Sequence, residues 1–224
     1  MLSSDRPRSP KMKTIGEIAA TVAGAARLLH NHGIDYLGMG DAPLEEAGRI
    51  SGVDLDALQS ALATLEQAPA DLPEDSVDLV DYIVTHYHEV HRRELRELVS
   101  LAWHVETVHK DDENAPVGLA RLLEDAQGDL EDHMGKEENI LFPSIRSNFR
   151  GSLFGPIIVM RHEHDEHTKM VRSIQVLTTG LNAPEGSCGS WRGLYVGLDK
   201  LITDLLEHIY VENNVLFPRF EGAR

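Results

Sequence analysis

One short pattern of histidine and glutamate occurs twice in this 224-residue chain and constrains its fold more than any other feature. Residues 133–143 read HMGKEENILFP and residues 208–218 read HIYVENNVLFP, so both copies are H-x-x-x-E-x-N-[IV]-L-F-P. A second shared element, H-[DE]-x-H, begins 45 residues before the first copy, at 88–91, and 44 residues before the second, at 164–167. A repeat that keeps histidine and glutamate while the residues between them drift indicates a symmetric metal site, because these side chains bind hard and borderline metals.

Hydrophobic periodicity predicts α-helices throughout and no β-strands. We expect four long helices, over about 76–109, 117–147, 156–179 and 190–218, joined by loops that carry proline or glycine. Helices of this length with short connections form an up-down-up-down four-helix bundle. The predicted fold class is therefore all-α, and the repeat divides the bundle into two similar helical hairpins.

A smaller helical unit is expected before the bundle. Shorter helical patterns cover about 15–20, 22–32, 43–51 and 54–67, and a proline-bearing acidic stretch follows them. The predicted organisation is a disordered N-terminus at 1–13, a small helical domain at 14–68, a linker at 69–75 and the bundle at 76–224.

Charge and cysteine content exclude several classes of function. The formal net charge of −16 argues against nucleic acid or an anionic membrane as a partner, because both require a basic surface. Cys188 is the one cysteine, so a disulfide within the chain is impossible and a reducing cytoplasm fits best. The sequence shows neither a signal peptide nor an apolar window long enough to span a bilayer.

The two repeated elements together supply a full set of metal ligands. In each copy of the longer motif, the histidine and the glutamate are four residues apart and share one face of a helix. The first histidine of each H-[DE]-x-H element adds an imidazole from each of the other two helices. The predicted ligands are His88, His133, Glu137, His164, His208 and Glu212. Inward-facing Glu and His from four helices are how bundles build di-iron or di-manganese sites.

Charge balance supports a pair of metal ions. Two divalent ions, four neutral imidazoles and two carboxylates leave a surplus of about +2, which an oxo, hydroxo or exogenous anion offsets. Each carboxylate has two oxygens and is the natural bridge, whereas each imidazole is a natural terminal ligand. Zinc favours a tetrahedral site, so two irons fit six shared ligands better, but the residues alone leave manganese or a mixed pair open.

Other polar residues near the motifs have two interpretations. The second histidine of each short element is expected either to hydrogen-bond a ligand or to lie in solvent; these are His91 and His167. Three acids have the same alternatives, with the surface favoured: Glu89, Glu163 and Asp165. Histidines without a counterpart in the repeat are expected in solvent: His86, His104, His109 and His162. His30 and His32, in the first domain, are not expected to bind metal.

The remaining motif residues are expected to be structural. We expect the Leu-Phe pairs at 141–142 and 216–217 to pack in the core, and Pro143 and Pro218 to end or kink their helices. Gly135 either leaves room for an exogenous ligand or marks a close helix contact, which we favour. We expect Cys188 to be an inert thiol.

The chain resembles a known family beyond its metal motifs. The doubled motif resembles the hemerythrin-like domains of bacteria. Over about 14–220, the chain is similar to the iron-sulfur cluster repair di-iron proteins, also called the repair of iron centres or ScdA/YtfE family. The segments that carry this second resemblance are TIGEI at 14–18, AAR at 25–27, GIDY at 33–36, GPIIVM at 155–160, EHDE at 163–166 and ENNVLFP at 212–218.

The resemblance implies a function and also shows one departure. The family's iron ligands fall on the six residues selected above, and the family restores damaged iron-sulfur clusters and reacts with nitric oxide in nitrosative or oxidative stress. Its N-terminal domain carries a Cys-Cys-Gly-Gly turn, where this chain has Leu37 and Gly38 in place of the two cysteines. Family activities that need this dithiol are therefore not carried over.

Three functions are weighed. The first is a non-haem di-iron protein of the cluster-repair type, which reacts with nitric oxide or supplies iron, and which as an enzyme would be an oxidoreductase that reduces nitric oxide. The second is a hemerythrin-like protein that binds, stores or senses O2 or NO reversibly, and the third is a bundle held by metal for structural reasons. The expected partners are a small diatomic ligand and iron-sulfur proteins, and a homodimer is left open.

Overall fold

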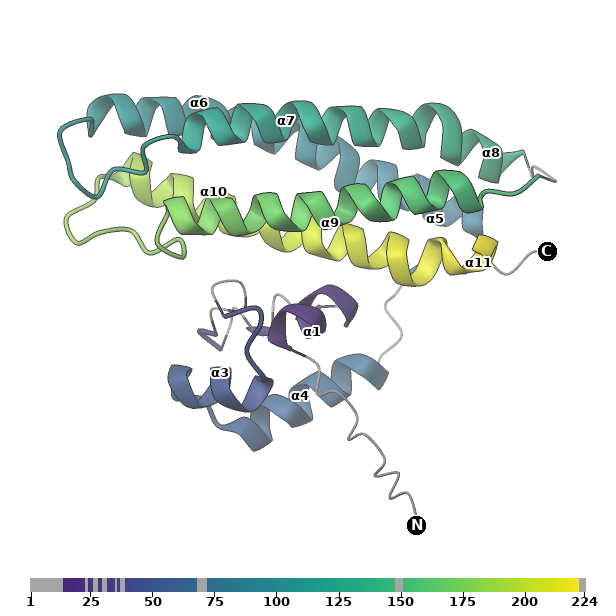
Figure 1. Cartoon of the computed structure of the whole chain (residues 1–224), viewed down its shortest axis with the longest axis horizontal. Helices are drawn as coiled ribbons and strands as arrows, with labels where there is room; N and C mark the ends of the chain where they lie inside the picture. The colour runs from purple at the N-terminus through teal and green to yellow at the C-terminus, as the bar shows by residue number, and fades with distance from the viewer. Residues whose placement is uncertain are drawn as a thin grey trace, which may run out of the picture.

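The computed structural model is helical throughout the part of the chain that it describes, which is residues 14–22, 24–25, 28–29, 32–34, 36, 39–67, 72–147 and 151–221. Four long helical rods lie side by side, and a smaller N-terminal unit lies against them (Figure 1). The described residues contain no strand, and their one β-bridge joins Thr14 to Pro43. The all-α prediction is therefore confirmed.

Three of the four rods of the bundle are built from consecutive helical segments, one of which in each rod is π-helical (η). The first is α5 (Ser76–Ile83), η1 (Val84–His88) and α6 (Glu89–Val108). The second is α7 (Leu119–Lys136), η2 (Glu137–Leu141) and α8 (Phe142–Arg146). The third is α9 (Phe154–Leu177), and the fourth is α10 (Gly189–Tyr210), η3 (Val211–Leu216) and α11 (Pro218–Glu221).

The predicted rods lie within two or three residues of these bounds. Local sequence explains where the first rod starts, because the Asp75 carboxylate accepts hydrogen bonds from the backbone N–H groups of Val77, at 2.7 Å, and Asp78, at 3.2 Å. Such an N-cap satisfies donors that have no partner inside the helix. Periodicity did not predict the three π segments, and neither proline ends its rod, because Pro143 lies inside α8 and Pro218 begins α11.

Side-by-side packing follows the order of the bundle. Helix α6 packs against α7 and α10, and α7 packs against α9. Gly197 permits the approach of α10 to α6, since a Cβ there would lie 2.6 Å from Leu98 Cδ2. The result is the predicted antiparallel four-helix arrangement.

The N-terminal unit contains α1 (Ile15–Thr21), α3 (Leu44–Ser51) and α4 (Leu55–Gln67). Helix α1 lies on α10, and Ile15 and Ala19 share an apolar core with Trp191 and Tyr195. Three of the four predicted short helices match these elements. The fourth, over 22–32, falls partly outside the described residues, as does the linker, and the segment 1–13 falls wholly outside them, so the domain boundaries stay a prediction.

A layer of buried polar side chains divides the core of the bundle. One apolar cluster, which includes Leu95 and Leu206, joins one end of the bundle to the N-terminal unit. The other cluster, which includes Phe142 and Phe217, fills the opposite end. The histidines and glutamates of the repeat lie between them. Among the described helices, none is long and apolar enough to cross a membrane.

Candidate metal centre

The structure brings all six predicted ligands into this polar layer. They come from all four rods: His88 ends η1, His133 lies on α7, His164 on α9 and His208 on α10, while the glutamates lie in π segments. Each of the six is between 0 and 1% exposed. These six side chains are therefore shielded from solvent, and their binding of metal stays a prediction.

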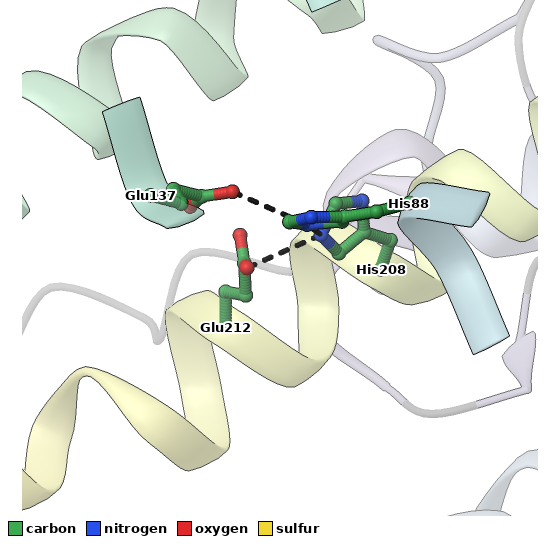
Figure 2. Close-up of side chains that lie close together, drawn as sticks. All are labelled: His88, Glu137, His208 and Glu212. Atoms are coloured by element: carbon green, nitrogen blue, oxygen red, sulfur yellow. Dashed lines mark hydrogen bonds and ion pairs between the residues drawn. The ribbon is translucent and has the colours of Figure 1, made fainter. Parts of the chain in front are cut away.

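The six side chains form two groups of four that share both carboxylates. One group is His88, Glu137, His208 and Glu212, and the other is His133, Glu137, His164 and Glu212. Within each group, one nitrogen or oxygen atom from each residue lies within 4.8 Å of the others. Figure 2 shows the first group, with Glu137 directed toward His88 and Glu212 toward His208.

Each carboxylate faces one imidazole from its own rod and one from another. Glu137 Oε2 lies 3.6 Å from His133 Nε2 and 3.3 Å from His88 Nε2. Glu212 has the equivalent neighbours, with Oε1 3.1 Å from His208 Nε2 and Oε2 3.0 Å from His164 Nε2. Each glutamate therefore lies between the two halves, as a bridging ligand must.

Hydrogen bonds fix three of the four imidazoles from behind. His88 Nδ1 lies 2.7 Å from a Glu138 carboxylate oxygen, and His133 Nδ1 lies 2.9 Å from Glu163. His164 Nδ1 lies 3.0 Å from the side-chain oxygen of Asn213. Because these oxygens are acceptors, each Nδ1 donates its proton to them and leaves Nε2 as a lone pair directed at the centre.

Two of these partners were missed by sequence reasoning and one was underrated. Glu138 and Asn213 directly follow the two ligand glutamates, at a motif position where the residue type differs between copies, so only that position hinted at a role. Glu163 is half-buried rather than a surface acid. Glu89 and Asp165 are exposed, as favoured.

Burial keeps the imidazoles neutral. Desolvation, followed by the neighbouring His208, lowers the pKa of His88 to about 4. Desolvation and His164 lower the pKa of His133 to about 2. Both rings are thus uncharged at neutral pH and have a lone pair for a cation.

The two carboxyl groups differ from each other. Desolvation and the nearby Glu212 raise the pKa of Glu137 well above its usual range. Burial acts in the same direction on Glu212, but the imidazoles of His208 and His164 outweigh it and hold the pKa of that carboxyl well below its usual range. Like charges this close are unfavourable together unless a cation lies between them.

The second histidines of the short elements are buried against the ligands. His91 is 0% exposed and lies 5.4 Å from His208, ring centroid to ring centroid. His167 is 5% exposed and lies 4.8 Å from His133. Desolvation, with the nearby ligand histidines, lowers both pKa values, that of His167 to about 3. The solvent-exposed alternative for these two residues is therefore wrong.

The unrepeated histidines lie away from the centre. His86, His104 and His162 are exposed, as expected. His32 contacts the Leu28 carbonyl oxygen, and His30 is outside the described residues. His109 was predicted to lie in solvent, but it is half-buried, and its Nε2 lies 3.1 Å from the Sγ of Cys188.

One further expectation needs correction, one is confirmed and one stays a prediction. The His109 contact and the Trp191 backbone N–H lower the pKa of the Cys188 thiol, and the inertness of this thiol stays a prediction. A Cβ on Gly135 would meet only the Asn139 amide, at 4.0 Å, so the predicted close helix contact is wrong. Phe142 and Phe217 are buried in the core, as expected.

Phe142 and Phe217 also stack on the ligand rings, which encloses the centre. The Phe142 ring lies 5.7 Å from His88, and the Phe217 ring lies 5.9 Å from His164. The apolar cluster that contains both phenylalanines therefore keeps water from that side of the centre.

The two halves differ in what surrounds them. A cavity of 320 Å³ on the outside of the bundle reaches His167 and Glu163 and has Asp129 and Asp132 in its wall. Tyr87 holds the position in the other half that Glu163 holds here, since each directly precedes a ligand histidine. The Tyr87 ring stacks on His208 at 5.1 Å, and burial raises the pKa of its phenol, which stays neutral.

The fold and the buried His–Glu layer define a hemerythrin-like cation-binding domain, and comparison with known families agrees. The family model described as "Hemerythrin HHE cation binding domain" matches residues 79–220. The model ScdA_N, described as "Domain of Unknown function (DUF542)", matches residues 11–66.

Comparison with curated proteins identifies the family more narrowly. "Iron-sulfur cluster repair protein YtfE" of Edwardsiella ictaluri is 40% identical over an alignment of 226 positions, which covers 99% of each chain. The protein of the same name from Pectobacterium atrosepticum is 38% identical over 211 residues, 92% of this chain and 96% of the relative. The chain belongs to the iron-sulfur cluster repair family, and the resemblance found in its motifs is confirmed.

Proposed function

We propose that this protein is a non-haem di-iron protein of the iron-sulfur cluster repair type, which acts in nitrosative or oxidative stress. In this role it reacts with nitric oxide or supplies iron to damaged clusters. The observation that carries the proposal is the pair of four-residue groups that share Glu137 and Glu212.

The donor atoms fit cations better than protons. The Nε2 atoms of His88 and His208 lie 3.2 Å apart, as do those of His133 and His164. Where Nδ1 carries the proton, Nε2 is a lone pair that faces other lone pairs and carboxylate oxygens, an unfavourable arrangement unless a positive ion lies between them. The four oxygens of Glu137 and Glu212 are buried and have no hydrogen-bond partner among the described residues.

The proposed iron ligands are the six predicted residues, with one ion in each half. Glu137 and Glu212 would bridge the two ions, and an oxo or hydroxo bridge would offset the remaining charge. Bound iron supplies one-electron chemistry and open positions for a small diatomic ligand. The protein holds the imidazoles in the Nδ1–H form through Glu138, Glu163 and Asn213 and excludes water with the two phenylalanines.

We also propose the domain organisation given above and a cytoplasmic location. The contact of α1 with α10 supports an N-terminal domain that docks on the bundle. The two family matches end and begin on either side of the predicted linker. The single cysteine suits a reducing compartment. Iron-sulfur proteins are the proposed macromolecular partners, as the relatives' name suggests for those proteins.

One feature favours a second candidate, a hemerythrin-like protein that binds O2 or NO without turnover. The chain has Leu37 and Gly38 where the family carries its dithiol, so no thiol pair at that turn can return electrons to the centre. Residues 37 and 38 lie outside the described residues.

Exposure of the reduced protein to nitric oxide without oxygen distinguishes the two candidates. We expect nitrous oxide and a re-oxidised centre if the protein turns over. A stable adduct with no gaseous product would favour the binding protein. Transfer of iron to a cluster-free iron-sulfur protein, measured in parallel, tests the iron-supply activity.

A further inference from the structure

The repeated motif keeps one polar residue that the proposed function does not use. An asparagine stands two residues after each proposed ligand glutamate, at Asn139 and Asn214. Both side chains are exposed on the outside of the bundle and belong to neither group of four donors. Because the two asparagines are repeated with the proposed ligands but point away from them, we infer that they have a role other than binding the metal.

Both asparagines make the same contact with the backbone. The Asn139 side-chain amide donates to the carbonyl oxygen of Gly135 at 2.7 Å. The Asn214 amide donates to the carbonyl oxygen of Tyr210 at 3.1 Å. Each bond reaches back four residues and spans the point where an α-helix gives way to a π segment.

The π segments matter because they contain both carboxylates. Glu137 is the first residue of η2 and Glu212 is the second residue of η3. In these segments the backbone bonds reach five residues, from Phe142 N–H to the Glu137 carbonyl and from Phe217 N–H to the Glu212 carbonyl. Single π-helical turns are rare. Each residue of an α-helix turns it by about 100°, so loss of the extra residue would rotate each glutamate, near the start of its segment, relative to the core phenylalanine that follows the segment.

A second pair of side-chain bonds lies beyond the first. Ser144 Oγ donates to the Ile140 carbonyl at 2.7 Å, and Arg219 Nε donates to the Val215 carbonyl at 3.0 Å. These positions are equivalent in the two copies of the repeat. Each π segment is therefore spanned by donors at both of its ends, although the second donor differs in chemical type.

We propose that Asn139 and Asn214 are positioning residues that hold η2 and η3 in the π-helical register and thereby direct Glu137 and Glu212 between the two halves of the centre. The proposal rests on the proposed function, because it assigns the asparagines to the metal centre. They act through the backbone and touch neither metal nor substrate.

Substitution of each asparagine by leucine, which has a similar shape but no N–H donor, tests the role. The probe is cobalt(II), whose visible spectrum reports coordination geometry, titrated into the metal-free full-length protein. We expect Asn139→Leu and Asn214→Leu to weaken cobalt binding about tenfold, the lower end of the effect of indirect partners of metal ligands, and to change the spectrum. Asn139→Ser should restore both, because a serine hydroxyl reaches the carbonyl four residues back, as Ser144 does.

A matched control separates this role from general helix stability. Thr168 Oγ1 donates to the His164 carbonyl at 3.0 Å on α9, which carries a proposed ligand but no π segment. We expect Thr168→Ala to keep the affinity and the spectrum of the unaltered protein.

Three results would overturn the proposal. One is an unchanged cobalt affinity and spectrum in both leucine variants, even if their metal-free melting temperatures fall. Another is an equal change in Thr168→Ala, and the third is failure of Asn139→Ser to restore binding. An unaltered protein that binds neither cobalt nor iron would instead contradict the proposed function itself, before any variant is compared.

Discussion

The two halves of the candidate metal centre are equivalent in their proposed ligands and different in their surroundings. Each half takes one histidine from a short element and one from a long motif, and both share the same glutamates. The half with His133 borders an acidic cavity, whereas Tyr87 covers the half with His208. The two copies of the repeat thus keep the same proposed ligands, whereas the residues directly before His88 and His164 differ, being Tyr87 and Glu163.

The surroundings also differ in how the imidazoles are held. In the half with His133, both ligand histidines have a hydrogen-bond acceptor at Nδ1, namely Glu163 and Asn213. In the other half, Glu138 holds His88, but Nδ1 of His208 has no partner among the described residues. One half therefore lies beside the cavity and has both imidazoles oriented by hydrogen bonds, and we call it the accessible half. Tyr87 covers the other, the enclosed half, where Nδ1 of His208 has no partner among the described residues.

Removal of a shared carboxylate should have the largest effect on metal binding, because both halves lose a proposed ligand. We expect Glu212→Ala to reduce bound iron from about two ions per chain to nearly none, since both groups lose a bridging ligand. Elemental analysis measures this loss. His104→Ala, a change at an exposed histidine, should keep full iron, and full iron in Glu212→Ala would contradict the assignment of the site.

Loss of one acceptor should affect one half more than the other. We expect Glu138→Gln, which acts on His88, to weaken metal binding about 10- to 100-fold in the enclosed half. Glu163→Gln should do the same in the accessible half. Two-step metal titrations of both variants measure the effect, and weakening of the same step in both would contradict the separation of the halves.

Access to solvent should appear in the rate at which the ions leave. We expect a chelator to remove iron in two phases, with the faster phase from the half beside the cavity. Tyr87→Ala should speed the slow phase about tenfold, because a large-to-small change opens the cover over His208. Release kinetics followed by absorbance measure both phases, and a slow phase that does not change would show that Tyr87 does not limit access.

Acid should destabilise the metal-free protein. The folded-state pKa values of His88 and His133 lie below the unfolded value of 6.5, so the unfolded chain binds more protons as the pH falls below it. From pH 6.5 down to about 4, stability should fall by about 1.4 kcal/mol per pH unit for each such histidine. The raised pKa of Glu137 acts in the opposite direction and offsets about one of them.

Urea unfolding of the chelator-treated protein at pH 7.5, 6 and 5 measures this dependence. Iron should restore stability at pH 7.5 and lose its effect as protons compete for the imidazoles. A metal-free protein that is equally or more stable at pH 5 would show that these histidines do not stay neutral when buried.

The inner layer of this centre was predictable from sequence, whereas its surroundings were not. Helical spacing places His133 with Glu137, and a duplicated pattern implies that both copies face one point. Glu138 and Asn213 occupy a motif position where the copies differ, so the repeat carried no signal for them. The Cys188–His109 contact joins residues 79 positions apart, which only the folded chain brings together.

The fold, too, was predictable from sequence in part only. Periodicity located the four rods, because a 3.6-residue stripe depends only on local sequence. It did not locate η1, η2 and η3, because segments of five or six residues are too short to show a period of their own. The two motif asparagines lie in two of these segments, η2 and η3, but their hydrogen bonds to the backbone became evident only in the structure.

We propose that the two groups of four donors hold two iron ions in one bridged centre. Iron analysis of the purified protein, together with its optical spectrum, tests this proposal. We expect about two irons per chain and the absorption of an oxo-bridged pair. One iron or none per chain after iron loading, or iron without that absorption, would contradict it.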